Sequence, residues 1–150
     1  MTLAVAALMV VTAQTSVPTN LPGQACTPAA LVGTWKIVEA KQGGETLPAG
    51  PTDPIQYKYL TPTNFMVFEV APTGAKTINW AHGGTYTVAG GTYTESIQHG
   101  FGQPYSVVSG KSFAFQCTLE GNDTWHMAGD VAGTPIIETW RRVSGDEKAP

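Results

Sequence analysis

Residues 84–96 read Gly-Thr-Tyr-Thr-Val-Ala-Gly-Gly-Thr-Tyr-Thr-Glu-Ser, with the two central glycines at positions 90 and 91. β-Forming residues on both sides of a Gly-Gly pair predict a β-hairpin with a two-residue turn, because glycine adopts the positive φ angles that such a turn needs. With the tip at these glycines, Val88 pairs with Tyr93 and Tyr86 pairs with Glu95 across the hairpin. We therefore expect aromatic side chains and a carboxylate on one face of this hairpin.

The same reasoning predicts a second hairpin, with its tip at Ala132-Gly133. This tip pairs Trp125 with Trp140 and Met127 with Glu138. The aromatic side chains of the two strands then share one face with the carboxylate. We expect this face to point into the protein.

The rest of the chain has short runs of β-forming residues separated by Gly, Pro, Asn and Asp. Charged residues make up only 13% of the 150, with 17 Gly and 11 Pro, a balance that suits strands and tight turns. Ile55, Tyr57 and Tyr59 alternate with Gln56 and Lys58, which predicts a strand with an aromatic inner face. Roughly nine such runs predict an all-β fold, a single antiparallel up-and-down β-barrel of about 8–10 strands.

Four segments are expected along the chain. Residues 1–13 have the apolar run and small residues that end a secretion signal, although no Lys or Arg precedes the run, and a plain disordered N-terminus is the alternative. Residues 14–28 are rich in Thr, Pro, Gly and Ser and are expected to form a disordered linker. The barrel is expected over residues 29–144, with a loop at 100–111 and a tail at 145–150. The protein is then secreted or periplasmic.

Cys26 and Cys117 are the only cysteines. An even number of cysteines in an exported chain predicts a disulfide, which would tie the N-terminal segment to the barrel. The alternative is a pair of buried free thiols.

Charge and hydropathy narrow the class of partner. The formal net charge is −3 and the Lys and Arg residues are scattered, so no basic face is available for nucleic acid. The longest apolar run, residues 3–11, is shorter than the roughly 20 residues that span a bilayer. We expect a small-molecule ligand, no cofactor apart from a candidate divalent metal, and a monomer or small homo-oligomer.

Two short motifs carry a family resemblance. Leu-Val-Gly-Thr-Trp-Lys at 31–36 resembles the Gly-x-Trp opening of lipocalins and their calycin relatives, and Thr-Trp-Arg-Arg-Val at 139–143 resembles their closing strand. Residues 83–88 and 92–95 are also similar to small bacterial lipocalin-like proteins, and the likeness covers residues 30–143. It implies that Trp35, after Gly33, plugs the barrel floor, and that Arg142, or alternatively Arg141, packs across it.

One departure from the resemblance bears on the ligand. Fatty-acid-binding members hold a carboxylate with an Arg-x-Tyr pair on the last strand, and the matching positions here are Glu138 and Trp140. A buried glutamate would repel a fatty-acid carboxylate. The expected ligand is therefore small, partly apolar, and neutral or cationic.

The candidate ligand contacts are the residues on the inner faces of the predicted strands. They are Tyr57, Tyr86, Tyr93, Glu95, Phe115, Trp125, Glu138 and Trp140. The alternative for the two carboxylates is a structural role as hydrogen-bond acceptors in a filled core, since an unpaired buried carboxylate is costly. For five of the aromatic residues a place in the core or cavity wall is preferred to a specific ligand contact: Tyr57, Tyr86, Tyr93, Phe115 and Trp125.

An enzyme on the same barrel is a second hypothesis. The first hairpin, extended, pairs His82 with His99 on the face of Glu95, which would make a metal site or an acid–base group for an isomerase, lyase or hydrolase. The alternative is two solvated histidines, because Gly83-Gly84 can shift the register by one residue. A third hypothesis is a structural domain with a filled barrel.

Overall fold

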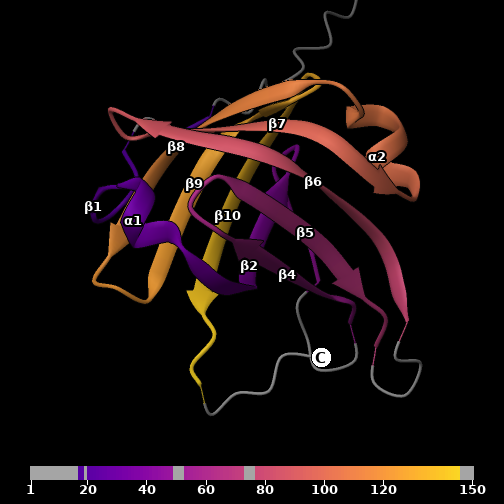
Figure 1. Cartoon of the computed structure of the whole chain (residues 1–150), viewed down its shortest axis with the longest axis horizontal. Coiled ribbons are helices and arrows are strands. Elements are labelled where there is room, and N and C mark those ends of the chain that lie inside the picture. The colour runs from indigo at the N-terminus through magenta and orange to yellow at the C-terminus, as the bar shows by residue number, and fades with distance from the viewer. Residues whose placement is uncertain (1–16, 19, 49–52, 73–76, 146–150) are drawn as a thin grey trace, which may run out of the picture.

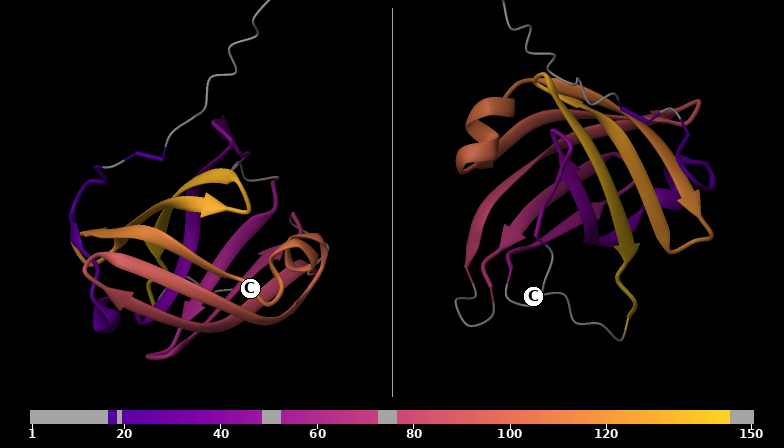
Figure 2. Two further views of the ribbon diagram at one scale, coloured as in Figure 1. Left: turned by 90° about the horizontal axis from the view of Figure 1, so that it is seen from above. Right: turned by 180° about the vertical axis from the view of Figure 1, so that it is seen from behind.

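Eight antiparallel strands close into a barrel in residues 17–18, 20–48, 53–72 and 77–145, the part of the chain that the computed structural model describes (Figure 1). These strands are β2 (Gly33–Gln42), β4 (Ile55–Leu60), β5 (Asn64–Val70), β6 (Ile78–Ala89), β7 (Thr92–Phe101), β8 (Ser112–Glu120), β9 (Thr124–Val131) and β10 (Thr134–Arg142). Each pairs with the next along the chain, and β10 pairs back with β2 (Figure 2). The predicted up-and-down barrel is confirmed.

Both predicted hairpin registers are confirmed. Gly90 and Gly91 have φ angles of 57° and 76°, as a turn with two positive φ angles requires. Ala132 and Gly133 repeat this pattern with 53° and 88°. The predicted partners are all present: Val88 with Tyr93, Tyr86 with Glu95, Trp125 with Trp140, and Met127 with Glu138.

Four short elements complete the described fold. They are β1 (Gln24–Ala25), which pairs with β8, β3 (Glu45–Thr46), which pairs with β2, and the helices α1 (Pro28–Leu31) and α2 (Gln103–Val108). The prediction of a loop at 100–111 was wrong, because β7 continues to Phe101 and α2 follows it. α2 packs on β6 and β7 at one end of the barrel (Figure 1). No helix among the described residues is both long and apolar enough to cross a membrane.

A disulfide joins Cys26 to Cys117, as predicted. It lies beside the β1–β8 pairing, and the Cys26 amide donates to the Cys117 carbonyl. Residues 24–26, assigned above to a disordered linker, are held on β8 by hydrogen bonds and the cross-link, and Pro28 begins α1. The predicted signal at residues 1–13 lies outside the described residues, as does the predicted tail apart from Gly145.

The end of the barrel near α1 is filled with aromatic side chains. Trp35, Tyr93, Trp125 and Trp140 are all completely buried. Trp125 meets the rings of Trp35 and Tyr93 edge-on, at centroid distances of 5.5 and 5.2 Å. This packing closes one end of the barrel interior.

Arg142 seals the same end by packing across Trp35. Its guanidinium carbon lies 4.1 Å from the centre of the Trp35 ring. The guanidinium also donates to three backbone carbonyls, those of Ala30, Val32 and Asn122. Gly33 has a φ angle of +139°, which L side chains rarely adopt, and a Cβ atom there would also lie 2.5 Å from the Arg142 Nη1, so this position favours glycine. Arg142 and Trp35 thus lie against each other at the packed end of the barrel.

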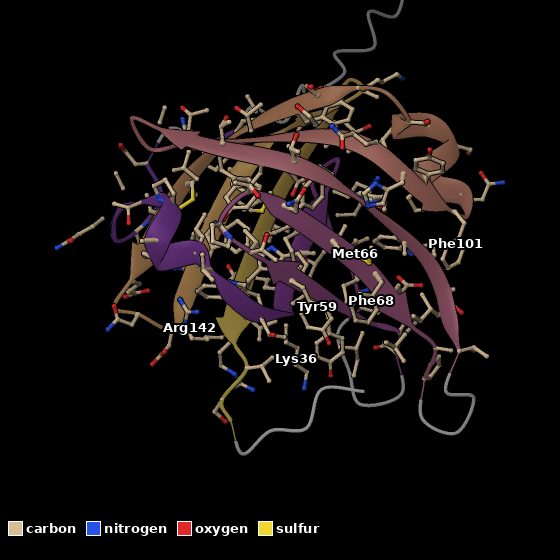
Figure 3. All side chains as sticks on the ribbon, in the orientation of Figure 1. Lys36, Tyr59, Met66, Phe68, Phe101 and Arg142 are labelled. Carbon is tan, nitrogen blue, oxygen red and sulfur yellow. A yellow bond between two sulfur atoms is a disulfide. The ribbon has the colours of Figure 1, made fainter. Side chains whose placement is uncertain are left out.

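A second apolar cluster lies on the outer side of the barrel, on β4 to β6. It contains Tyr57, which stacks on Phe68 at a ring distance of 5.8 Å. Tyr59 packs on the same Phe68 ring, and Figure 3 shows both. The prediction of an aromatic inner face on β4 was therefore wrong. The tyrosines face outward, and Lys58 faces the barrel interior, where it pairs with Glu95.

Candidate functional site

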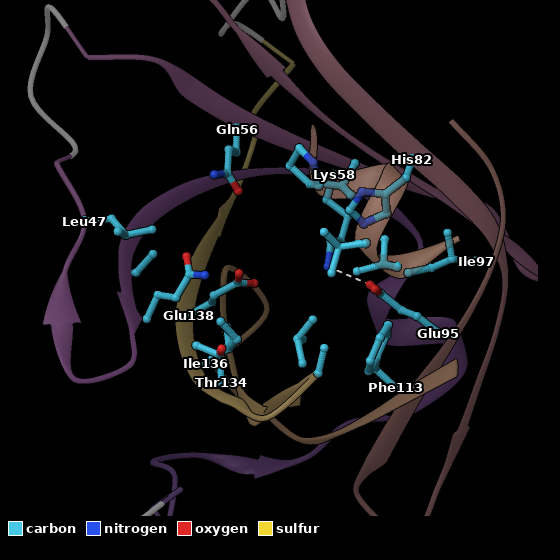
Figure 4. Close-up of a pocket in the computed structure, with 18 of the residues that line it drawn as sticks. Leu47, Gln56, Lys58, His82, Glu95, Ile97, Phe113, Thr134, Ile136 and Glu138 are labelled. Carbon is cyan, nitrogen blue, oxygen red and sulfur yellow. Dashed lines mark hydrogen bonds and ion pairs between the residues drawn. The ribbon is translucent and has the colours of Figure 1, made fainter. Parts of the chain in front are cut away.

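The barrel is hollow at its α2 end. A cavity of about 360 Å³ lies there, in the size range of small-molecule sites (Figure 4). Its apolar wall includes Val67, Trp80, Ile97, Phe113, Ile136 and Trp140, and α2 contributes Pro104, Val107 and Val108. Its polar groups include Gln56, Lys58, His82, Glu95, Thr134 and Glu138. The cavity has a largely apolar wall and a few polar groups.

Lys58 and Glu95 form a buried ion pair in this cavity. The Lys58 Nζ lies 2.7 Å from the Glu95 Oε1, and both side chains are at most 5% exposed. The Tyr93 hydroxyl donates to the same carboxylate oxygen at 2.9 Å. Glu95, predicted to be a ligand contact, is thus already neutralised by a residue of its own chain.

The Lys58 ammonium is also surrounded by aromatic rings. It lies 4.9, 5.2 and 5.6 Å from the ring centres of Trp140, Trp125 and Tyr93, which we call the aromatic cage. These distances are within the range of cation–π attraction. The aromatic cage therefore holds an internal cation beside its carboxylate partner.

Glu138 is the second carboxyl group of the cavity. Its Oε2 accepts a hydrogen bond of 2.9 Å from the Trp140 indole, and none is formed by its Oε1 among the described residues. Burial raises the pKa of Glu138, Lys58 lowers it and Glu95 raises it, with a net upward shift. The shift makes protonation easier than for a carboxyl group in water, and the protonated form can both donate and accept a hydrogen bond.

His82 contributes an uncharged imidazole to the cavity wall. It stacks on Trp80 at a ring distance of 5.5 Å, and burial lowers its pKa from 6.5 to about 4. Its Nδ1 is buried without a hydrogen-bond partner in the described part of the chain. Such an atom is costly unless a bound molecule satisfies it.

The predicted pairing of His82 with His99 was wrong. The register shifts between Gly83 and Gly84, so that His82 lies opposite Gly100, and His99 lies opposite Gly83. The extra residue of this bulge on β7 reverses the alternation, which leaves His99 exposed on the outer side. Among the described residues no group of three His, Cys, Asp or Glu side chains has the placement for a metal ion.

The other predicted contacts fall in three places. Glu95, Glu138 and Trp140 line the cavity. Tyr86, Tyr93, Phe115 and Trp125 belong to the packed core, where Tyr93 supports Glu95 from outside the cavity lining. Tyr57 lies on the outer side, as described above.

Sequence reasoning missed Lys58, the residue at the centre of the polar set. It was assigned to solvent because alternation was interpreted with the aromatic residues inside. The available signal was the two inward carboxylates, which require a buried cation as partner.

Comparisons with known proteins give a family match and two structural neighbours, of which the redesigned β-barrel supports the fold. The sequence matches the family described as "Domain of unknown function (DUF4488)" over residues 30–150. A redesigned β-barrel aligns with a TM-score of 0.51 at 16% identity, covering 81% of this chain and 97% of that one. A mutant of the fluorescent protein UnaG aligns with a TM-score of 0.43 at 11% identity, covering 79% and 99%. No curated protein matches the sequence.

Proposed function

Since the chain belongs to the DUF4488 family, a family without an assigned activity, we propose from its cavity that it is a binding protein for a small, partly apolar, neutral or cationic molecule. The observation that carries this proposal is the contrast between the two ends of the barrel. One end is packed with tryptophans, and the other holds a cavity of about 360 Å³ with an orphaned imidazole nitrogen in its wall. A domain with a purely structural role has no need for such a space.

The charge of the cavity argues against carboxylate ligands. The cation Lys58 is paired with Glu95, and the second carboxyl group, Glu138, stands nearby. A ligand carboxylate would meet Glu138, and the other lysine of the lining, Lys41, is 44% exposed and paired with Glu39. Fatty acids are therefore poor candidates.

We also infer that the protein works outside the cytoplasm, in a secreted or periplasmic setting. The Cys26–Cys117 disulfide is the support, because structural disulfides persist in oxidising compartments. Mass spectrometry of the protein from its native source tests the inference by showing whether the cross-link and the predicted signal at residues 1–13 are present.

Titration with the uncharged fluorophore diphenylhexatriene tests the proposed function. Its fluorescence should rise on entry into the apolar cavity, and dodecanoic acid should not displace it. Ile136→Trp fills the cavity and should abolish the signal, whereas Ile137→Trp changes a neighbour that does not line the cavity and should preserve it. Equal binding by both variants would show that the probe binds elsewhere.

A further inference from the structure

The deepest polar group of the cavity is a cation that the protein itself supplies. The aromatic cage of Tyr93, Trp125 and Trp140, with Glu95 as counter-ion, has the chemistry that proteins use to bind ammonium ligands. Here the Lys58 ammonium occupies that position and is only 3% exposed. The Met127 sulfur lies 3.8 Å away on another side.

Building on the proposed function, we propose that Lys58 determines the charge specificity of the cavity. By filling the cationic subsite itself, Lys58 restricts the ligand to an uncharged, partly apolar molecule whose polar end is a hydroxyl or amide group. That polar end hydrogen-bonds to Glu138 and His82. This narrows the ligand from neutral or cationic to neutral.

A cationic ligand would face Lys58 at close range. The ammonium cannot retreat to water, because Glu95 and the aromatic cage hold it in the interior. A second cation in the cavity would lie beside it in a low-dielectric space, where like charges repel strongly. Glu138 alone would have to compensate for this repulsion.

An anionic ligand would need Lys58 for itself. Taking the ammonium from Glu95 leaves that carboxylate with only the Tyr93 hydroxyl, in a site where Glu138 is a second acid. A buried carboxylate without a cation is strongly unfavourable. The ion pair thus disfavours both signs of charge.

Among the polar groups of the lining, His82 and Glu138 each offer an uncharged ligand an atom that can form a further hydrogen bond. The Nδ1 of His82 has no partner within the described residues, and the Glu138 carboxyl uses only one oxygen for Trp140. Figure 4 shows both side chains on the wall of the same cavity. A hydroxyl or amide can donate and accept hydrogen bonds, so it can satisfy both groups without carrying charge.

Three forms of one fluorophore test the proposal: diphenylhexatriene, its trimethylammonium derivative and its propionic acid derivative. The full chain should bind the uncharged form at least about tenfold more tightly than either charged form. Lys58→Met should raise affinity for the trimethylammonium form by about tenfold or more, because it empties the aromatic cage and frees Glu95.

Two further variants separate Lys58 from a general loss of charge. Lys36→Met removes a lysine of β2 that is not part of the cavity lining and should leave all three affinities unchanged. Lys58→Met/Glu95→Gln also removes the counter-ion and should lose the gain for the cation. Near-ultraviolet circular dichroism establishes that each variant keeps the native aromatic packing.

The outcomes distinguish this inference from the proposed function. If no form of the fluorophore binds the unaltered chain, the proposed function fails and the inference fails with it. If the cationic form binds the unaltered chain as tightly as the uncharged form, the inference alone is overturned, whatever the variants do. A folded Lys58→Met protein without a gain for the cation also overturns it.

Discussion

Lys58 on β4 and Glu95 on β7 meet at 2.7 Å across the barrel interior, although β5 and β6 separate their strands in the sheet. The pair therefore links two walls of the barrel through its lumen. It lies where the packed aromatic end gives way to the cavity, since its neighbours are core residues on one side and cavity-lining residues on the other.

Breaking this ion pair on one side should destabilise the fold strongly. Lys58→Met leaves Glu95 buried without a cation, which should cost about 3–5 kcal/mol in the free energy of unfolding. Lys58→Met/Glu95→Gln removes both charges and should recover much of that loss. Urea unfolding followed by tryptophan fluorescence measures both, and a single variant as stable as the unaltered chain would contradict the structure.

His82 should make stability fall in acid. The pKa of its imidazole is about 4 in the folded chain against 6.5 in the unfolded chain, so protonation favours the unfolded state. The contribution of the neutral imidazole to the free energy of unfolding is complete above pH 6.5 and is lost as pH falls toward 4. The loss is on the order of 3 kcal/mol. His82→Gln should remove this part of the pH dependence, whereas His99→Gln, at an exposed site, should not. Unfolding curves between pH 7 and 4 test the difference.

Glu138 should act in the opposite direction. The pKa of its carboxyl is raised by burial above 4.5, so the folded state favours the protonated form. Its contribution is complete below pH 4.5 and is lost as pH rises through the folded-state pKa. Glu138→Gln should therefore gain stability relative to the unaltered chain as pH rises. A difference that is constant with pH would refute this. Glu39→Gln, on an exposed side chain, is the matched control.

Removing the disulfide should weaken the whole barrel. Cys26 and Cys117 are 91 residues apart. Closing a loop of that length lowers the entropy of the unfolded chain and so stabilises the folded state by about 4–5 kcal/mol. Cys26→Ala/Cys117→Ala should show a loss of this size in urea unfolding. Hydrogen exchange should also become faster at the β1–β8 pairing, because only two residues of β1 pair with β8.

Arg142 should be sensitive even to a conservative change. Arg142→Lys keeps the charge but loses the planar contact with Trp35 and at least one of the three carbonyl hydrogen bonds. A loss of about 1–3 kcal/mol in unfolding free energy is expected. Arg141→Lys, the exposed neighbour, should stay within about 0.5 kcal/mol. Equal effects at the two positions would exclude a special role for Arg142.

The candidate site was predictable in part. A two-residue turn determines which side chains face each other across a hairpin. Counting from the two turns therefore predicted the inward positions of Glu95, Glu138 and Trp140. The same counting failed at His99, because it cannot detect a bulge farther along the strand. Counting from a turn also could not predict which face of β4 is inside, because the turn that follows β4 has three residues and no Gly-Gly pair.

The amino-acid sequence by itself determined the local pairing: Gly90-Gly91 and Ala132-Gly133 specify two hairpins, and period-2 alternation specifies which residues share a face. Only the tertiary structure decided which face is the inner one. Both faces of β4 carry large side chains, so the pattern alone does not decide which face is inside. Lys58 points inward because Glu95, distant in sequence, supplies its counter-ion, and Tyr57 stacks on Phe68 on the outer side. Such contacts between distant segments exist only once the barrel has closed.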